Sequence, residues 1–154
     1  MEPLVSEQIT RKSASNLAAA FVLLPREKRL AMNALYAYCR EVDDVADEES
    51  IPLDQRRDEL AKWREQTESA CRGGTPSLPV IRELQPAIER YRLPFRLFDD
   101  LLQGVEADLV TTRYETYAQL EEYCYRVASA VGLLSIEIFG YRNDGCRAYA
   151  IHLG

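Results

Sequence analysis

Acidic residues gather at the end of an apolar stretch, in the segment CREVDDVADE. Asp43 and Asp47 are four residues apart, so they lie on one face of a helix, with Arg40 on the same edge. Two carboxylates so spaced repel each other and meet the negative end of the helix dipole, which costs the helix up to about 1 kcal/mol. A hard cation such as Mg²⁺ gives one reason to accept this cost, because it binds carboxylate, phosphate and water oxygens. The spacing therefore allows two interpretations, a Mg²⁺ site and an ordinary solvated helix end.

Arg40 has two neighbours at helical spacing. Tyr36 lies one turn before it on the same edge, and Asp44 lies one turn after it. An exposed ion pair between Arg40 and Asp44 is the ordinary use of such spacing. Asp44 also stands beside the two aspartates, which makes it a candidate third ligand.

Helical periodicity must position these residues, because alternating strand patterns and Asn-Gly hairpins are scarce along the chain. Proline, glycine and serine clusters separate the helical segments. The predicted helices cover about 6–23, 26–48, 53–71, 94–110 and 115–139, with a further one that begins near Ser77 and is kinked at Pro86 and a last one from about 143. We therefore predict an all-α fold, an antiparallel bundle with short connections.

Composition excludes several classes of protein. The chain has 154 residues, of which 47% are hydrophobic, so one domain with a real core is expected. A net charge of −6 argues against a nucleic-acid partner. The four cysteines lack CxxC spacing and are expected to be buried free thiols in a reducing compartment. We expect a cytoplasmic protein without a membrane span, and contact with a membrane surface stays open.

A second group of candidates lies in the predicted helix 115–139. Tyr123 could present a hydroxyl and a π face to a cavity, or it could be a core tyrosine with a bonded hydroxyl. Small and branched residues follow it, and they either leave room for a ligand or let helices pack closely. These residues are Val127, Ala128, Val131 and Gly132. Asp99 and Asp100 imitate a metal pair but are expected to face solvent, and Asp108 is expected to have a structural or supporting role.

Three sequence blocks together resemble the squalene/phytoene synthases, the head-to-head isoprenyl diphosphate synthases. SASNLAAAFVLLPREKRLAMNALYAYCREVDDVADE is similar to the first block of that family, LLQGVEADL to a short G-x-x-x-D-L segment, and YCYRVASAVGLLSIEIFG to the second block. The blocks occur in the family's order and cover nearly the whole chain. Within the family, the SASN start and CREVDDVADE are most similar to the bacterial presqualene diphosphate synthases of hopanoid biosynthesis.

The resemblance implies an all-α isoprenoid synthase fold and a role for each matching residue. It implies Mg²⁺ as cofactor, with Asp43 and Asp47 as ligands and Asp44 adjacent. Arg40 matches a diphosphate-contacting arginine and Tyr36 the tyrosine one turn before it, while Tyr123 matches a cavity tyrosine that acts near the leaving diphosphate. The polar start and the cavity wall would bind substrate, through Ser13, Asn16, Leu17, Val127, Ala128, Val131 and Gly132. Leu17 departs from the family, where an aromatic is common.

The implied reaction condenses two farnesyl diphosphates into presqualene diphosphate. The alternatives are a phytoene synthase that acts on geranylgeranyl diphosphate and a non-catalytic interaction module of the same family. The family's second aspartate-rich motif would follow Gly154 and is absent from the sequence, so we expect the N-terminal part of a single prenyl synthase domain, incomplete at its C-terminus and inactive alone. The expected partner is an isoprenyl diphosphate, with no nucleic acid and with peripheral membrane contact as an option. Oligomeric state cannot be predicted.

Overall fold

The structure is a computed structural model that describes residues 4–12 and 16–154, without the side chains of residues 17 and 18. The described residues form helices and no strand, which confirms the predicted all-α class. In chain order the elements are α1 (Val5–Lys12), α2 (Asn16–Phe21), α3 (Arg26–Asp47), α4 (Leu53–Cys71), α5 (Pro79–Tyr91), α6 (Phe95–Asp108), α7 (Tyr117–Cys124), a π-helical turn (Tyr125–Ser129), α8 (Ala130–Phe139) and α9 (Gly145–Leu153).

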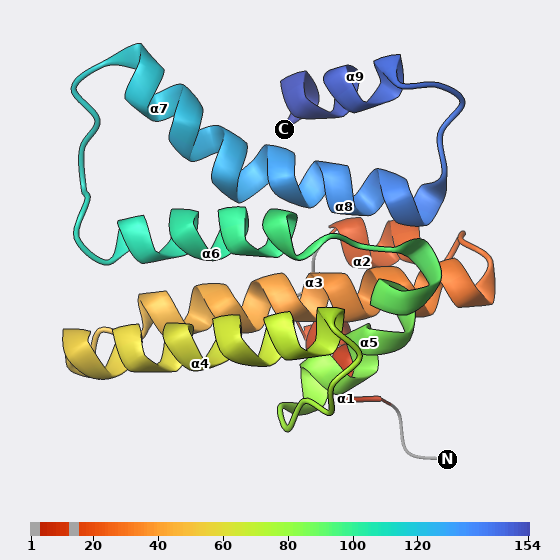
Figure 1. Cartoon of the computed structure of the whole chain (residues 1–154), viewed down its shortest axis with the longest axis horizontal. Coiled ribbons are helices and arrows are strands. Elements are labelled where there is room, and N and C mark those ends of the chain that lie inside the picture. Colours follow the sequence, from red (N-terminus) through yellow and green to blue (C-terminus); the bar gives the residue numbers. More distant parts are fainter. Residues whose placement is uncertain (1–3, 13–15) are drawn as a thin grey trace.

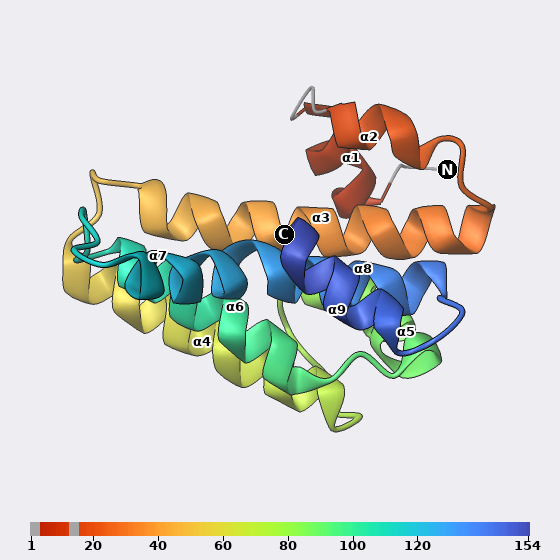
Figure 2. The same ribbon diagram turned by 90° about the horizontal axis from the view of Figure 1, so that it is seen from above.

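The 22-residue helix α3 lies at the centre of the bundle. α4 runs back along it, α6 packs against both, and the run from α7 to α8 returns antiparallel to α6 (Figure 1). α9 then packs on α8, while α1 and α2 lie on another side of α3 (Figure 2). The C-terminal end of α3, which carries the acidic segment, therefore lies near the end of α6 and the start of α7.

The core closes around one aromatic residue of α3. Tyr38 is fully buried, and its ring meets Trp63 of α4 and Phe98 of α6 edge-on, at centroid distances of 5.4 and 5.3 Å. Its hydroxyl lies 3.0 Å from Oγ1 of Thr67, which donates to the Trp63 carbonyl at 2.7 Å. The buried hydroxyls of Tyr38 and Thr67 thus both have a hydrogen-bond partner, as burial requires. The Tyr38 side chain fixes the register of three helices.

Two predicted helices have different boundaries. In place of the predicted helix 6–23, the described residues form the two helices α1 and α2. The predicted helix 115–139 contains a π-helical turn, closed by a hydrogen bond from the Ala130 amide to the Tyr125 carbonyl. A π turn holds one extra residue, so the faces before and after it are out of register. Leu134 and Ile138, which follow the π turn, are buried, whereas Leu120, which precedes it, is 41% exposed.

The sequence favoured buried thiols for the four cysteines. Cys39, Cys71 and Cys146 are half-buried, but Cys124 is exposed, so burial is wrong for Cys124. In the ranges 4–12 and 16–154, no helix combines the length and the apolar character that crossing a bilayer requires.

Candidate functional site

The acidic segment occupies the last turns of α3. Val42 is fully buried and Ala46 is 7% exposed, so the apolar positions face the core. Asp43 and Asp47 lie on the edge between core and solvent, and both are exposed in this chain. The predicted helical spacing of the two carboxylates therefore exists, one turn apart.

Asp43 lies in a region of negative potential. Desolvation by the surrounding helices raises the pKa of its carboxyl to about 6, and the charge of Asp47 adds to the shift. Arg40 opposes the increase, while Asp108 from α6 and the adjacent Asp44 contribute to it. A cation at this place would relieve the repulsion, because ionising Asp43 beside other carboxylates is unfavourable.

Arg40 forms the ordinary ion pair that its spacing allows. One of its guanidinium nitrogens lies 3.3 Å from Asp44, and both side chains are more than half exposed. Tyr36 is half-buried, with its ring edge-on to Phe21 of α2 at 6.1 Å between centroids. In this chain Arg40 therefore contacts Asp44, and Tyr36 joins α3 to α2.

Tyr123 joins the acidic edge from the opposite side of the bundle. Its hydroxyl donates to Oδ2 of Asp108 at 3.0 Å, and its ring packs on Tyr114 at 5.0 Å between centroids. Desolvation raises the pKa of the Tyr123 phenol, and the hydrogen bond to Asp108 and the charges of Asp108 and Asp43 raise it further. The phenol is therefore neutral at physiological pH, within electrostatic reach of Asp43.

A glycine in α6 permits this meeting of helices. A Cβ on the buried Gly104 would lie 2.7 Å from Cγ1 of Val127 and 3.0 Å from Cβ of Arg126. Only a residue without Cβ lets the π turn approach α6 so closely. Gly104 and Asp108 are one helical turn apart, so the close approach brings Tyr123 to the end of α6. The G-x-x-x-D spacing thus has a structural explanation.

Replacing Gly104 by alanine is expected to destabilise the chain by about 1–3 kcal/mol, because the new methyl group overpacks this contact. The free energy of unfolding from urea titration measures the effect. Gly132→Ala is the matched control, since its Cβ would meet only the Ala150 carbonyl at 3.4 Å and helix propensity favours alanine. Equal stability of Gly104→Ala and the parent chain would show that the helices are not held this closely.

The predicted cavity wall lies in the π turn and the first turn of α8. Val127, Ala128, Val131 and Gly132 are all half-buried. Gly132 faces the Ala150 carbonyl of α9, and the nearby Ser129 hydroxyl donates to the Ile151 carbonyl at 2.7 Å. A Cβ at position 132 would still fit against α9, so close packing does not require a glycine there, and all four residues remain candidates for a ligand wall.

A cleft of about 420 Å³ opens beside Tyr123. It lies between the end of α6, the loop after it and the start of the α7 run, with Tyr114 and Tyr123 on its wall. Arg113 and Arg126 also line it, and Arg126 pairs with Glu122 at 2.6 Å. Glu115 and Glu122 line the cleft as well, so its two arginines are matched by two carboxylates.

The described residues contain no group of three or more His, Cys, Asp or Glu side chains that could hold a metal ion on its own. Mg²⁺ is commonly bound by one or two carboxylates together with phosphate and water oxygens. The donors Asp43 and Asp47, two carboxylates one helical turn apart, fit that type of site.

Three predicted substrate-binding residues, Ser13, Asn16 and Leu17, lie near the start of the chain, where the structure describes only some of the residues and side chains. Ser13 lies outside the described residues, and so does the side chain of Leu17. Asn16 is the first residue of α2 and is exposed.

One expectation is wrong and one interaction was missed. Asp99 was expected to face solvent, but it accepts a hydrogen bond from Nε of Arg64 in α4 at 2.7 Å. The sequence does not reveal this pairing, because the partner lies on another helix. The hydrogen bond between Tyr123 and Asp108 was missed for the same reason, although the G-x-x-x-D spacing of Gly104 and Asp108 was visible in the sequence.

Comparisons with known proteins agree with these features. The sequence profile of the squalene/phytoene synthases matches residues 10–154. A presqualene diphosphate synthase of Rhodopseudomonas palustris is 38% identical over 141 residues, which is 91% of the chain and 50% of that protein. A phytoene synthase of Mycobacterium tuberculosis is 35% identical over 150 residues, 97% of the chain and 48% of that protein. The chain spans about half the length of the curated relatives it matches.

Solved structures show the same relation. A dehydrosqualene synthase crystallised with a ligand superposes with a TM-score of 0.86 at 32% identity, over 97% of this chain and 51% of that one. A squalene synthase from Alicyclobacillus acidocaldarius superposes with a TM-score of 0.84 at 30% identity, over 96% of this chain and 54% of that one.

Proposed function

The chain belongs to the squalene/phytoene synthase family, and we propose that it supplies the first half of a prenyl synthase domain that joins two farnesyl diphosphates into presqualene diphosphate. Its all-α structure has the isoprenoid synthase fold, and its family consists of head-to-head isoprenyl transferases. The observation that carries the proposal is the position of Asp43 and Asp47, one turn apart, at the end of the bundle where Asp108 and Tyr123 meet.

The chemistry begins with loss of diphosphate from an allylic carbon. Mg²⁺ bound by Asp43 and Asp47 would neutralise charge on the departing diphosphate oxygens. Arg40 lies one turn before Asp44 and can exchange that exposed ion pair for a diphosphate oxygen. Tyr123 stays a neutral phenol and offers its π face and oxygen lone pairs near the same place. The half-buried Val127, Ala128 and Val131 would help to exclude water from the carbocation.

Two alternatives remain for the activity. Phytoene synthases of several organisms are similar to the chain at nearly the same identity as the presqualene diphosphate synthases, so the prenyl chain length is open. Retention of Asp43 and Asp47 disfavours a non-catalytic module. Product analysis with C15 and C20 diphosphates on the longer protein proposed here distinguishes all three, and absence of product from both substrates would contradict the enzyme. The 154-residue chain alone is expected to form no product.

The pKa of Asp43 predicts how metal binding depends on pH. Because the carboxyl is half-protonated near pH 6 and Mg²⁺ needs the carboxylate, Mg²⁺ affinity should rise as pH increases through 6 and level off above 7. In the metal-free chain the folded state binds the extra proton between the ordinary pKa of 3.8 and about 6, so stability falls as pH rises through that window. Calorimetric Mg²⁺ titrations at pH 5.5 and 7.5 test the first expectation.

Asp43→Asn tests the second expectation. With chelator present, this variant should unfold at higher urea concentration than the parent chain at pH 7.5, and the difference should shrink at pH 4. Asp58→Asn, an exposed change on α4, serves as the control and should leave the pH dependence unchanged. Equal urea midpoints for Asp43→Asn and the parent at pH 7.5 would contradict a raised pKa.

We also propose that the turn between α2 and α3 contacts an anionic lipid surface. Val22 is 66% exposed and Leu23 is 88% exposed, and Arg26, Lys28 and Arg29 follow them. Exposed aliphatic side chains beside cations are the usual composition of a surface that inserts among lipid headgroups.

The chain is expected to co-sediment with vesicles in which about one third of the lipid is phosphatidylglycerol. Leu23→Ser should weaken vesicle binding about five- to tenfold, because an inserted side chain is lost. Val110→Ser removes an exposed apolar side chain elsewhere and should have little effect. Equal binding of the parent chain and Leu23→Ser would refute this contact.

A further inference from the structure

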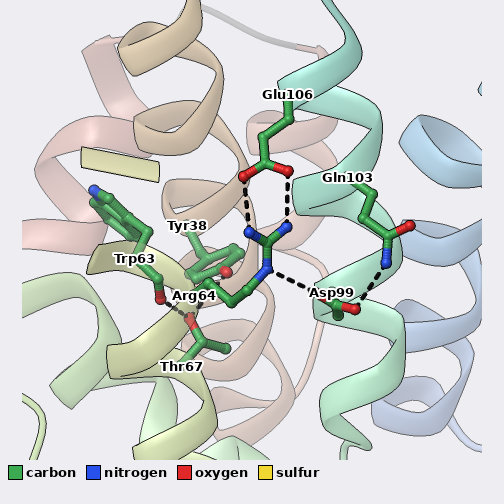
Figure 3. A network of polar contacts seen from close by, with 7 residues as sticks. All are labelled: Tyr38, Trp63, Arg64, Thr67, Asp99, Gln103 and Glu106. Atoms are coloured by element: carbon green, nitrogen blue, oxygen red, sulfur yellow. Dashed lines mark hydrogen bonds and ion pairs between the residues drawn. The ribbon is translucent and has the colours of Figure 1, made fainter. Parts of the chain in front are cut away.

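Arg64 of α4 connects α4 to two turns of α6. Its Nη1 and Nη2 donate to the two carboxylate oxygens of Glu106 at 2.7 and 3.0 Å, and its Nε donates to Asp99 at 2.7 Å. The second oxygen of Asp99 accepts from Gln103 at 2.8 Å (Figure 3). All three charged side chains are only about 30% exposed. Bidentate, partly buried pairs of this kind are stronger and geometrically stricter than exposed ones.

The base of Arg64 is fixed by the aromatic core. Its neighbour Trp63 is 4% exposed and Thr67, one turn later, is fully buried against Tyr38. Figure 3 shows the guanidinium reaching from this buried cluster to the face of α6 that carries Asp99, Gln103 and Glu106. The position of the guanidinium therefore follows from the packing of α3 on α4.

The last turn of α6 needs a cation from outside. Glu106 and Asp108 both lie in that turn, where the helix dipole is negative, and the turn contains no basic residue. The backbone carbonyls of Glu106 and Ala107 already accept hydrogen bonds from the amides that follow the helix, so the charge left to balance is that of the two carboxylates. Arg64 supplies the opposite charge at Glu106, two residues before the aspartate that accepts the Tyr123 hydrogen bond.

We propose that Arg64 is a positioning residue, which holds the last turn of α6 so that Asp108 stays bonded to Tyr123 and faces the acidic edge of α3. The side-chain hydrogen bonds of Arg64 go to Asp99 and Glu106, which both belong to α6. Its effect on the site passes through α6. Only the consequence for catalysis rests on the proposed function, whereas the coupling of Arg64 to Tyr123 can be tested without it.

A double-mutant cycle in stability tests this coupling. In the parent chain, Tyr123→Phe should raise the unfolding equilibrium constant about tenfold, because a hydrogen bond to a carboxylate is lost. In the Arg64→Met background the same change should have an effect of about twofold or less, since Asp108 has already moved away. Independent sites would give effects that multiply within about twofold.

The control variant is Arg72→Met. Arg72 is the C-cap residue of α4 and pairs with Glu68 one turn earlier on the same helix. Tyr123→Phe should change the unfolding equilibrium constant by the same factor in this background as in the parent chain. If Arg64→Met does not fold, Arg64→Lys and Glu106→Gln replace it, because each keeps a polar partner but removes the bidentate geometry. Multiplicative effects of Arg64 and Tyr123 variants, or no effect of Tyr123→Phe in the parent, would overturn the proposal.

A second measurement addresses catalysis in the longer protein. Arg64→Met is expected to lower kcat about tenfold with little change in KM, whereas Arg72→Met should leave both within about twofold. Equal kcat of Arg64→Met and the parent would overturn the catalytic consequence. If no parent protein shows turnover, the proposed function fails, and the stability cycle still decides whether Arg64 positions Asp108.

Discussion

Replacing Asp43 or Asp47 by alanine is expected to lower Mg²⁺-dependent turnover of the longer protein by about a thousandfold or more. The two carboxylates are the proposed anchor of the metal that neutralises the leaving diphosphate, and removal of one transition-state contact of this electrostatic kind commonly costs 10²–10³ in kcat. Calorimetry should also show loss of Mg²⁺ binding by the 154-residue chain. The loss of turnover and the loss of Mg²⁺ binding have one cause, because the variant lacks a carboxylate that is proposed to bind the metal.

The controls separate this effect from loss of an acidic residue in general. Asp58→Ala removes an exposed aspartate from α4 and should keep full turnover and Mg²⁺ affinity. Asp43→Asn keeps the shape of the side chain and should be as inactive as Asp43→Ala, because the amide lacks the charge. Near-normal turnover in both alanine variants would exclude the two aspartates as ligands.

Replacing Tyr38 by alanine is expected to destabilise the chain by about 3–5 kcal/mol, the usual cost of deleting a buried aromatic ring. Tyr38 is fully buried, and the ring centroids of Trp63 and Phe98 each lie within 5.4 Å of its own. The lost ring would leave a cavity between α3, α4 and α6, and the Thr67 hydroxyl would lose its hydrogen bond with the Tyr38 hydroxyl. Urea unfolding measured by circular dichroism gives the change in free energy.

Tyr38→Phe is the matched comparison for this prediction. It keeps both ring contacts and removes only the hydroxyl near Thr67, so a loss of about 1 kcal/mol is expected. Thr67 still donates to the Trp63 carbonyl in that variant. A Tyr38→Ala variant as stable as Tyr38→Phe would show that the aromatic cluster does not hold the three helices together.

The sequence determined the helices and the acidic edge. Pro25 and Pro52 precede α3 and α4, and the 3.6-residue period puts Val42 and Ala46, which are buried, on a different face from Asp43 and Asp47. These features depend on neighbours within one turn, so local spacing is enough to predict them. The family resemblance also follows from local blocks of sequence.

Only the tertiary structure decided which helices meet and at which residues. The hydrogen bond between Tyr123 and Asp108 and the pairing of Arg64 with Glu106 each join residues distant in the chain. The charge that Asp108 adds near Asp43 is also a contribution from another helix. The π turn likewise put Leu120 out of register with Leu134, because one extra residue rotates a helix face without any strong sequence signal. Spacing along one helix fixes what lies on its own face, whereas the partner of that face is set by packing between helices.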